Sequence, residues 1–507
     1  MGGRIEHAMW SRLFELSSMG SGPLQARIRQ TVVTAILDGR LPAGIAVPSS
    51  RELAEELGVA RNTVVLAYQH LVDDGFLISR ERSGYFVRPD IAMPRAEIAP
   101  REHPSGRLAP AWAKRFMVRP SAQRNIVKPN DWQDYPYPFL YGQFDPTLFP
   151  TADWRECSRR ALGTAELKGW GPDLIDGDDP LLIDQIRTRV LPRRGVWVTP
   201  AEVMVTIGAQ QALFLLADLL VSRHTTVGIE DPGYPDARNI FAMKTSRIRA
   251  IPVDPRGAAI EGRLRGCDYV YLTPSCQCPT TATMSRERCE AVLAFAAAHD
   301  AVVLEDDYET DTNFAEQPTP ALKSLDSHQR VIYVGSLSKI LAPGLRLGYI
   351  IGPPELIREA RALRRLMLRH PPANNQRTAA LFLSLGHHEA LARRLNNIHR
   401  DRSLVLKRAL DRLLPGFTCA PGNGGSSYWI EGPTWLDTWA LAKRAQQSGV
   451  LIEPGDVFFM GEDPPRNFMR LGFSSIPAER IEPGVAALAQ LVTEMRPAID
   501  RHAELAK

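Results

Sequence analysis

Short apolar, β-rich runs alternate with helical stretches over most of this chain, from about residue 130 onward. EVMVTIG precedes the helical AQQALFLLADLLV, for example, and AVVLEDDYE follows the helical SRERCEAVLAFAAAH. Alternation of this kind is typical of an α/β fold with a mostly parallel sheet. Because ligands in such folds bind at the C-terminal ends of the strands, we expect the functional residues to follow these runs.

The length of 507 residues favours two or three domains rather than one core. The composition, with 44% hydrophobic and 23% charged residues, is typical of a soluble globular protein. No apolar run approaches the roughly 20 residues needed to cross a bilayer, and the start MGGRIEHAMW lacks a secretory apolar core. We therefore expect a cytoplasmic protein that has no membrane partner.

The first ninety residues show a different pattern, in which short helices follow one another closely. Apolar residues recur at four-residue spacing from Leu24 to Ile36, and PSSRELAEELG then begins with a capping box formed by Ser49 and Glu52. The turn GVAR leads to a second helical run, NTVVLAYQHLVDDG, and FLISRERSGYFV predicts a hairpin. Helix, helix-turn-helix and hairpin in this order predict a winged helix.

DNA contact is the expected role of this region. The N-terminal turn of the second helix in a helix-turn-helix enters the major groove, where polar side chains meet bases and phosphates. Each such side chain taken singly is also typical of a solvated surface, but the ordered set of elements favours DNA contact for the group. The predicted DNA-binding residues are Arg51, Arg61, Asn62, Thr63 and, in the wing, Gly84.

A basic, proline-rich segment separates this region from the rest of the chain. Residues 91–130 contain eight Lys or Arg, two Glu and six prolines, and they show no apolar period. This composition predicts a semi-extended linker. The expected domains are therefore a winged helix at 1–90, a linker at 91–130 and an α/β domain at 131–507.

Lys339 follows a buried-looking strand, VIYVGS, and lies among small and apolar residues. An amine that forms a Schiff base needs a lowered pKa, which desolvation in such a pocket provides. Ser336 and Ser338 are compact donors suited to a phosphate, and Arg346 lies in the strand-like GLRLGY, where an anion is the natural partner of a guanidinium. A surface lysine at a helix start is the alternative, but it explains neither the serines nor Arg346.

Residues at other strand ends fit the same chemistry. In AVVLEDDYE, Asp306 and Tyr308 share one face, where they suit a protonated ring nitrogen and a ring oxygen, although EDD alone also fits an acidic surface turn. After the strand EVMVTIG, backbone N–H groups of Ala209 and Gln210 open a helix and suit a phosphate. Tyr234, in EDPGYP, follows a strand and is suited to stack on a ring, although a tyrosine in a turn is more often simply half-buried. Together these residues predict pyridoxal phosphate as the cofactor.

The motifs resemble those of known families. Residues 23–87 resemble a GntR-type DNA-binding domain, most specifically in P-S-x-R-x-L-A and R-x-T-V-x-x-A-Y, although Ala60 replaces a serine that usually caps the recognition helix. From about residue 140, the motifs YGQFDPTLFP, TIGAQQAL, EDPGYP, TPSCQCPT, EDDYE, SLSK, LRLGY and MRLGFS resemble the fold-type I aminotransferases. The whole chain resembles a MocR/GabR-type regulator, in which these two domains are fused.

The resemblance implies the roles of individual residues. It implies that Lys339 holds the aldehyde of the cofactor, Asp306 its ring nitrogen and Tyr308 its 3-hydroxyl. It also implies that Tyr234 stacks on the ring and that the phosphate is held by Arg346, Ser336 and Ser338. Arg470, in MRLGFS, is expected to take the acid group of an effector. CQCPTT replaces the histidine, aromatic residue and glycine of the family pattern H-Q-aromatic-P-[TS]-G, which predicts a different effector shape.

Some residues invite other interpretations. Cys276 and Cys278 lack a second pair of ligands at metal-binding spacing, so no metal site is predicted. Asp236 stands where some relatives carry an arginine, which weakens the expectation of a second effector anchor. A basic run before a proline break is expected to form a solvated helix face, with a DNA-facing surface as the alternative: Arg364, Arg365 and Arg369.

We expect a transcriptional regulator that senses a small amino compound, whose amine displaces Lys339 and forms an external aldimine. The resemblance implies a head-to-tail homodimer whose two winged helices bind operator DNA at paired half-sites. A working aminotransferase that also binds DNA is the alternative, because the residues for the first half-reaction are present. Neither the effector, the operator nor the sign of regulation follows from any motif.

Overall fold

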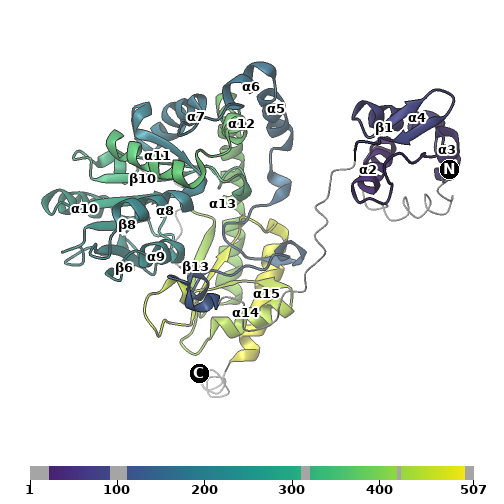
Figure 1. Cartoon of the computed structure of the whole chain (residues 1–507). Coiled ribbons are helices and arrows are strands. Elements are labelled where there is room, and N and C mark those ends of the chain that lie inside the picture. Colours follow the sequence, from purple (N-terminus) through teal and green to yellow (C-terminus); the bar gives the residue numbers. More distant parts are fainter. Residues whose placement is uncertain are drawn as a thin grey trace. The chain divides into compact units, whose positions relative to one another are not determined.

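The computed structural model describes residues 22–91, 111–309, 314, 320–337, 339–419 and 424–496. The chain divides into two compact units, Met1–Arg115 and Phe116–Lys507 (Figure 1). The second unit therefore begins inside the segment predicted as a linker, of which residues 92–110 lie outside the described residues. Within the described part of the chain, no helix has the length and apolar character needed to span a bilayer.

The first unit is a winged helix, as predicted. Its described elements are α2 (Leu24–Leu37), α3 (Ser50–Leu57), α4 (Arg61–Asp73), β1 (Leu77–Arg80) and β2 (Gly84–Val87). The two strands pair antiparallel and form the wing. The predicted capping box forms at the start of α3, where Ser49 Oγ accepts from the Glu52 N–H and the Glu52 carboxylate accepts from the Ser49 N–H. Val64 and Tyr68 of α4 are fully buried against α2 and α3.

The second unit is built on an eight-stranded sheet in the order β4-β11-β10-β9-β8-β5-β6-β7. The strands are β4 (Val203–Thr206), β5 (Val227–Asp231), β6 (Ile248–Asp254), β7 (Gly257–Ala258), β8 (Tyr269–Leu272), β9 (Val302–Asp307), β10 (Val331–Ser336) and β11 (Gly348–Ile351). Neighbours from β10 to β6 are parallel, whereas β11 is antiparallel to both β10 and β4. The predicted α/β fold is confirmed.

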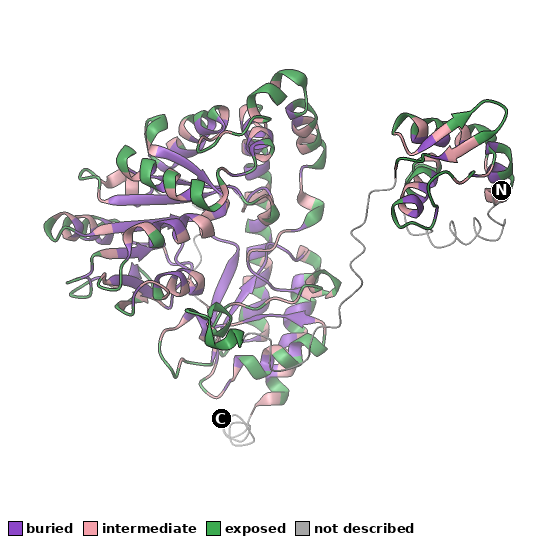
Figure 2. Cartoon of the chain, in the orientation of Figure 1, coloured by how far each residue is buried: buried purple, intermediate pink, exposed green. Residues whose placement is uncertain are grey.

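Helices cover both faces of this sheet, so most of its strands are buried, whereas β6 near one edge is mostly half-buried (Figure 2). They are α7 (Pro180–Gln185), α8 (Gly208–Leu220), α9 (Pro235–Ala242), α10 (Arg286–Ala298), α11 (Pro354–Leu368) and α12 (Ala373–Ser384), and α5 (Thr151–Ala161) and α6 (Thr164–Trp170) pack beside α12. Successive residues of a strand enter opposite cores: Val334 packs with Leu213 of α8, whereas Tyr333 packs with Ala380 of α12. Burial on both faces explains the near-continuous apolar runs of the sequence.

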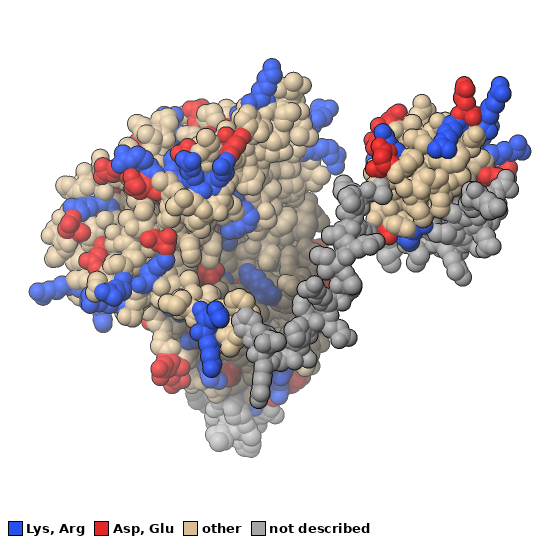
Figure 3. Space-filling view, viewed as in Figure 1, with Lys and Arg blue, Asp and Glu red and all other residues tan. Residues whose placement is uncertain are grey.

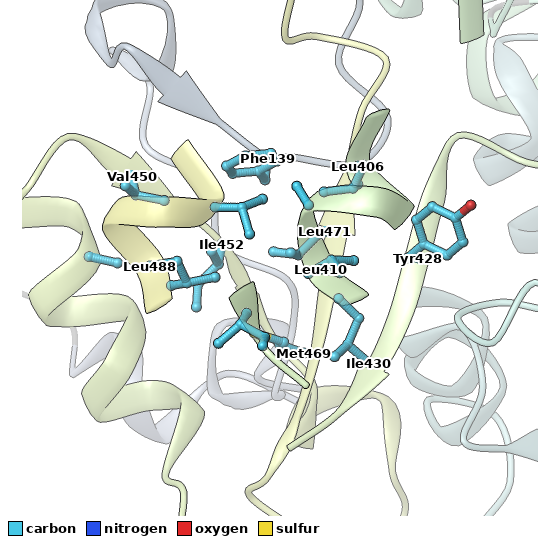
Figure 4. Close-up of a cluster of buried hydrophobic side chains, with 14 of the residues drawn as sticks. Phe139, Leu406, Leu410, Tyr428, Ile430, Val450, Ile452, Met469, Leu471 and Leu488 are labelled. Atoms are coloured by element: carbon cyan, nitrogen blue, oxygen red, sulfur yellow. The ribbon is translucent and has the colours of Figure 1, made fainter. Parts of the chain in front are cut away.

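The C-terminal part of the second unit has its own core. Its elements are α13 (His387–Leu413), α14 (Thr438–Gln447), α15 (Ala478–Met495), β12 (Thr418–Cys419), β13 (Ser427–Glu431), β15 (Glu453–Pro454), β16 (Phe468–Gly472), and the parallel pair β3 (Tyr137–Pro138) and β14 (Val450–Leu451). Strands β12, β13, β16 and β15 form an antiparallel sheet in this order. Phe139, just after β3, packs into this core with Leu406, Leu471 and Leu488 (Figure 4).

Candidate functional site

A cavity of about 350 Å³ lies where β9 and β10 end and α8 begins. It is lined by all the predicted cofactor and effector residues that the structure describes: Lys339, Asp306, Tyr308, Tyr234, Ser336, Arg346, Ala209, Gln210 and Arg470. Ser338 lies outside the described residues. Parallel strands bring their C-terminal ends to one edge of the sheet, which is why residues from separate motifs meet here.

Asp306 lies near the end of β9 and is 4% exposed. Its Oδ2 accepts a hydrogen bond from the Tyr271 hydroxyl at 2.8 Å, whereas Oδ1 has no hydrogen-bond partner among the described residues. Burial raises the pKa of this carboxyl from 3.8 to about 7. An orphaned, buried oxygen on the cavity wall fits a protonated ring nitrogen, because that cation supplies the missing partner.

Lys339 follows β10 and contacts aromatic rings. Its Nζ lies 4.2 Å from the centre of the Tyr141 ring and 5.8 Å from that of the Tyr308 ring. Burial lowers the pKa of the amine to about 8, with Glu309 opposing the shift and Lys128 adding to it. A lowered pKa leaves more of the amine unprotonated near neutral pH, as a nucleophile requires.

Arg346 corrects one expectation, since it does not lie in a strand. It follows a short 3-10 helix (Pro343–Leu345) with a φ of 51°, it is exposed, and β11 begins only at Gly348. The prediction that this guanidinium is buried in a strand, and for that reason needs an anion, was therefore wrong. A different observation places it at the cavity: a Cβ added to Gly208 would meet Arg346 Nη2 at 2.7 Å.

Several hydrogen-bond donors therefore converge at the start of α8. Ser336 is the last residue of β10 and lies opposite Gly348 of β11 in the sheet. Gly348 in turn lies opposite Thr206 of β4, which ends just before α8 begins at Gly208. Ala209 and Gln210 lie in the first turn of α8, where the backbone N–H groups lack partners within the helix. Side-chain and backbone donors of this kind beside a guanidinium fit a phosphate group.

The tyrosines have defined partners. The Tyr234 hydroxyl lies 2.9 Å from Gln210 Oε1 and 3.1 Å from Asp236 Oδ2, and the Tyr308 hydroxyl lies 3.9 Å from Cys276 Sγ. Asp236 thus holds Tyr234 in place. Stacking of Tyr234 on a ring and contact of Tyr308 with a ring oxygen stay predictions.

Arg470, from β16, lies at the other end of the cavity and is 2% exposed. Its Nε donates to Glu453 Oε2 at 2.7 Å, and its Nη1 lies 3.8 Å from Cys278 Sγ. Nη2 is buried and has no partner in the described part of the chain. The guanidinium carbon lies 4.1 Å from the centre of the Tyr141 ring, so Tyr141 contacts both Arg470 and Lys339.

Three further residues belong to the site but were not predicted from the sequence: Tyr141, Glu453 and Lys128. Tyr141 belongs to the motif YGQFDPTLFP, which carried a signal, whereas Lys128 was counted only as a charge of the linker. Lys128 Nζ lies 3.2 Å from Glu453 Oε1 and donates to the Tyr141 carbonyl. Burial alone would raise the pKa of Glu453, but Arg470 and Lys128 together hold it below its ordinary value.

The predicted DNA-binding residues lie on the surface of the first unit, where basic and acidic side chains are interspersed (Figure 3). Arg61 and Asn62 are exposed in the first turn of α4, and Thr63 is half-buried beside them. Arg51 is exposed on α3 and lies 3.3 Å from Glu55, and Gly84 opens β2. Ala60 caps α4 without a side-chain hydrogen bond, as the missing serine implies. DNA contact by these residues stays a prediction.

Arg364 contradicts the expectation of a solvated helix face. It is fully buried, pairs with Asp178 at 2.6 Å and donates to the carbonyl oxygen of Val205. Arg365 and Arg369 are exposed, and Arg369 forms an ion pair with Asp173. Arg364 therefore has a structural role in this unit and faces neither solvent nor DNA.

Comparisons with known proteins agree with this division. Residues 178–488 match the family described as aminotransferase class I and II, and residues 24–87 match the bacterial regulatory proteins of the gntR family. The chain is 44% identical to the HTH-type transcriptional regulator TauR of Rhodobacter capsulatus, over 94% of this chain and 98% of that protein. It is 29% identical to the probable rhizopine catabolism regulatory protein MocR of Rhizobium meliloti, over 92% and 93%.

Among solved structures, the second unit is similar to LysN, an α-aminoadipate aminotransferase from Thermus thermophilus complexed with N-(5'-phosphopyridoxyl)-L-leucine. The TM-score is 0.68 at 27% identity, covering 76% of this chain and 99% of that one.

Proposed function

Because this chain belongs to the MocR/GabR-type transcriptional regulators, which join a GntR-type winged helix to an aminotransferase class I and II domain, we propose that a small amino compound controls its binding to DNA. One observation carries the proposal. A buried arginine, Arg470, whose Nη2 has no partner among the described residues, shares a cavity with an amine of lowered pKa, Lys339. The cavity thus offers separate partners for an acid group and for amine chemistry.

The proposed cofactor is pyridoxal phosphate, and the residues present fit it. The orphaned Oδ1 of Asp306 fits the ring nitrogen, Lys339 fits the aldehyde, and Arg346 with Ser336 fits the phosphate. When bound, pyridoxal phosphate supplies an aldehyde that reacts reversibly with amines.

The residues of the chain would then recognise the effector at both ends. Lys339 would hold the cofactor at the amine end of the cavity, and Arg470 Nη2 would donate to the acid group at the other end. Tyr141, which contacts both cations, sets the distance between the two ends. An effector held in this way favours one conformation of the regulator over another, and it shifts DNA binding by its difference in affinity for the two.

On the DNA side, we propose that the first turn of α4 contacts operator bases, with Arg61 and Asn62 as the exposed donors. A head-to-tail homodimer would present two winged helices to paired half-sites. The proposed place of action is the cytoplasm, where operator DNA is found.

The test is a titration of the purified, cofactor-loaded protein with amino acids and amines, followed by visible absorption and by operator binding. We expect one class of compound to shift the absorption band stably and to change DNA affinity. Lys339→Ala should abolish both responses while basal operator binding remains. Amino compounds that leave DNA affinity unchanged would refute the proposal, and release of an oxo product would identify an aminotransferase instead.

A further inference from the structure

One wall of the cavity is formed by a segment that the sequence assigned to the linker. We call residues 123–128 the strap; its residues Asn125, Ile126 and Lys128 line the cavity together with Arg470 and Lys339. The strap belongs to the second unit, and the chain leads back from it toward the winged helix. Effector recognition and the path to the DNA-binding unit therefore share one short stretch of chain.

The strap is fastened to the second unit along its length. Asn239 Nδ2 donates to the Arg124 carbonyl at 2.9 Å, and Arg124 Nη2 lies 3.2 Å from Asp456 Oδ2. Asn125 donates to Asp236, the same carboxylate that accepts from the Tyr234 hydroxyl. These contacts fix the backbone that carries Lys128, so its ammonium is directed to the effector end of the cavity.

The charges at that end do not balance. Glu453 is the shared carboxylate of two cations, with Arg470 Nε at 2.7 Å and Lys128 Nζ at 3.2 Å. Arg470 and Glu453 are each 2% exposed, and the side chain of Lys128 is 23% exposed. Two positive charges and one negative charge leave an excess of one positive charge in a largely desolvated place, where it is unfavourable without an anion.

Other carboxylates near the cavity are already engaged. Glu309 accepts from the hydroxyls of Tyr141 at 2.9 Å and Ser426 at 2.8 Å, and its negative charge acts on Lys339, whose pKa it raises, so these two charges offset each other. Asp236 accepts from Asn125 and Tyr234, as described above. Meanwhile Arg470 Nη2 has no partner among the described residues, and an ammonium has three N–H donors, of which Lys128 uses two. Donors remain at this end of the cavity, and they come from two different segments.

We infer that Lys128 and Arg470 together bind the acid group of the effector, and that this group carries a single negative charge, as a carboxylate or a sulfonate does. The inference rests on the proposed function. It adds the charge of the effector's acid group, and it adds Lys128 of the strap as a residue that binds this group. A monoanion neutralises the excess charge, whereas a neutral group leaves it and a dianion reverses it. Binding also adds a contact to the strap, so the strap is held more firmly when the cavity is occupied.

The test uses the full-length, cofactor-loaded protein and four probes of similar length. β-Alanine and 2-aminoethanesulfonate carry monoanionic acid groups, 2-aminoethylphosphonate carries a dianionic one at pH 8, and propylamine carries none. Affinities are measured by calorimetry. We expect the wild type to bind the two monoanions more tightly than the other probes. Lys128→Met should weaken both monoanions about 10- to 100-fold, as expected for one charge-assisted hydrogen bond, and should leave propylamine unchanged.

Two variants serve as controls. Lys128→Arg keeps the charge and should retain most of the affinity for the monoanions. Lys114→Met removes an exposed lysine from the same predicted linker and should change nothing. Amide hydrogen exchange gives a second readout: β-alanine or 2-aminoethanesulfonate should slow exchange in residues 123–128 of the wild type but not of Lys128→Met.

Each outcome bears on the inference. It is overturned if Lys128→Met binds the monoanions as tightly as the wild type does, or if it loses propylamine equally. A wild type that prefers propylamine or the phosphonate, or that binds none of the probes, also overturns it. Failure of the proposed function would give a different result from failure of this inference. In that case the monoanions would bind in a way that depends on Lys128, but their binding would leave operator affinity unchanged.

Discussion

Replacing Asp306 by asparagine should separate the stability of the protein from its affinity for the cofactor. Burial raises the pKa of Asp306 from 3.8 to about 7, so between these values the folded state holds a proton that the unfolded chain has lost. The free energy of unfolding of the cofactor-free protein therefore falls as the pH rises through this window. An uncharged asparagine removes the contribution of Asp306 to this pH dependence and leaves that of Glu230, whose pKa burial also raises to about 7.

The size of the effect follows from the same values. Between pH 5 and pH 8 the free energy of unfolding of the wild type should fall by about 3 kcal/mol because of Asp306, and the variant should not show this fall. Asparagine can still accept from the Tyr271 hydroxyl, but its amide N–H₂ would lack a partner where Oδ1 is now, at a cost of about 1–3 kcal/mol. At pH 8 the cofactor-free variant should therefore be at least as stable as the wild type.

Denaturant unfolding of the cofactor-free proteins at pH 5 and pH 8 gives both values. Asp307→Asn is the matched control, because the Asp307 carboxylate pairs with Arg194 at 2.8 Å and accepts from the Tyr333 hydroxyl. Removing that carboxylate leaves a buried guanidinium and should cost about 3–5 kcal/mol at both pH values. Asp306→Asn should also bind pyridoxal phosphate more weakly, seen in visible absorption. A loss of stability for Asp306→Asn that is as large at pH 8 as at pH 5 would refute the reasoning.

Three further changes test separate parts of the molecule. Ala60→Ser supplies the missing cap of α4 and should stabilise the winged helix by about 1 kcal/mol in thermal unfolding; an unchanged or lower midpoint contradicts this. Arg61→Ala should weaken operator binding about tenfold, as expected for one lost base contact, without unfolding the helix and with less effect on unrelated DNA, and an unchanged operator affinity counts against it. Gly208→Ala, at a φ of 72° and against the Arg346 guanidinium, should weaken the binding of pyridoxal phosphate but not of pyridoxal, as absorption titrations of both will show.

The fold was predictable because its signals are local. The capping box at Ser49, the four-residue apolar spacing and the two strand-like runs each depend on a few neighbouring residues, and together they specify the winged helix. The alternation of strands and helices predicted the parallel sheet in the same way. The cofactor residues were found because they follow these strands, and parallel strands end at one edge of the sheet.

Expectations failed where distant contacts outweigh a local pattern. Arg346 stands in an alternating sequence typical of a strand, but the preceding Pro343 and Gly344 form a turn and leave it with a positive φ. Arg364 lies on a helix rich in arginine, which resembles a solvated face. Its burial depends on Asp178, 186 positions away, which no pattern around Arg364 reveals.

The sequence by itself determined the winged helix, the α/β sheet and the set of residues suited to pyridoxal phosphate. Only the tertiary structure decided how the effector end of the cavity is built, because Lys128, Tyr141, Glu453 and Arg470 come from four segments that carry no common local signal. Their ion pairs and ring contacts exist only once the strap, β15 and β16 are packed together. Lys128 of the predicted linker and Glu453 of the short strand β15 become site residues only through that packing.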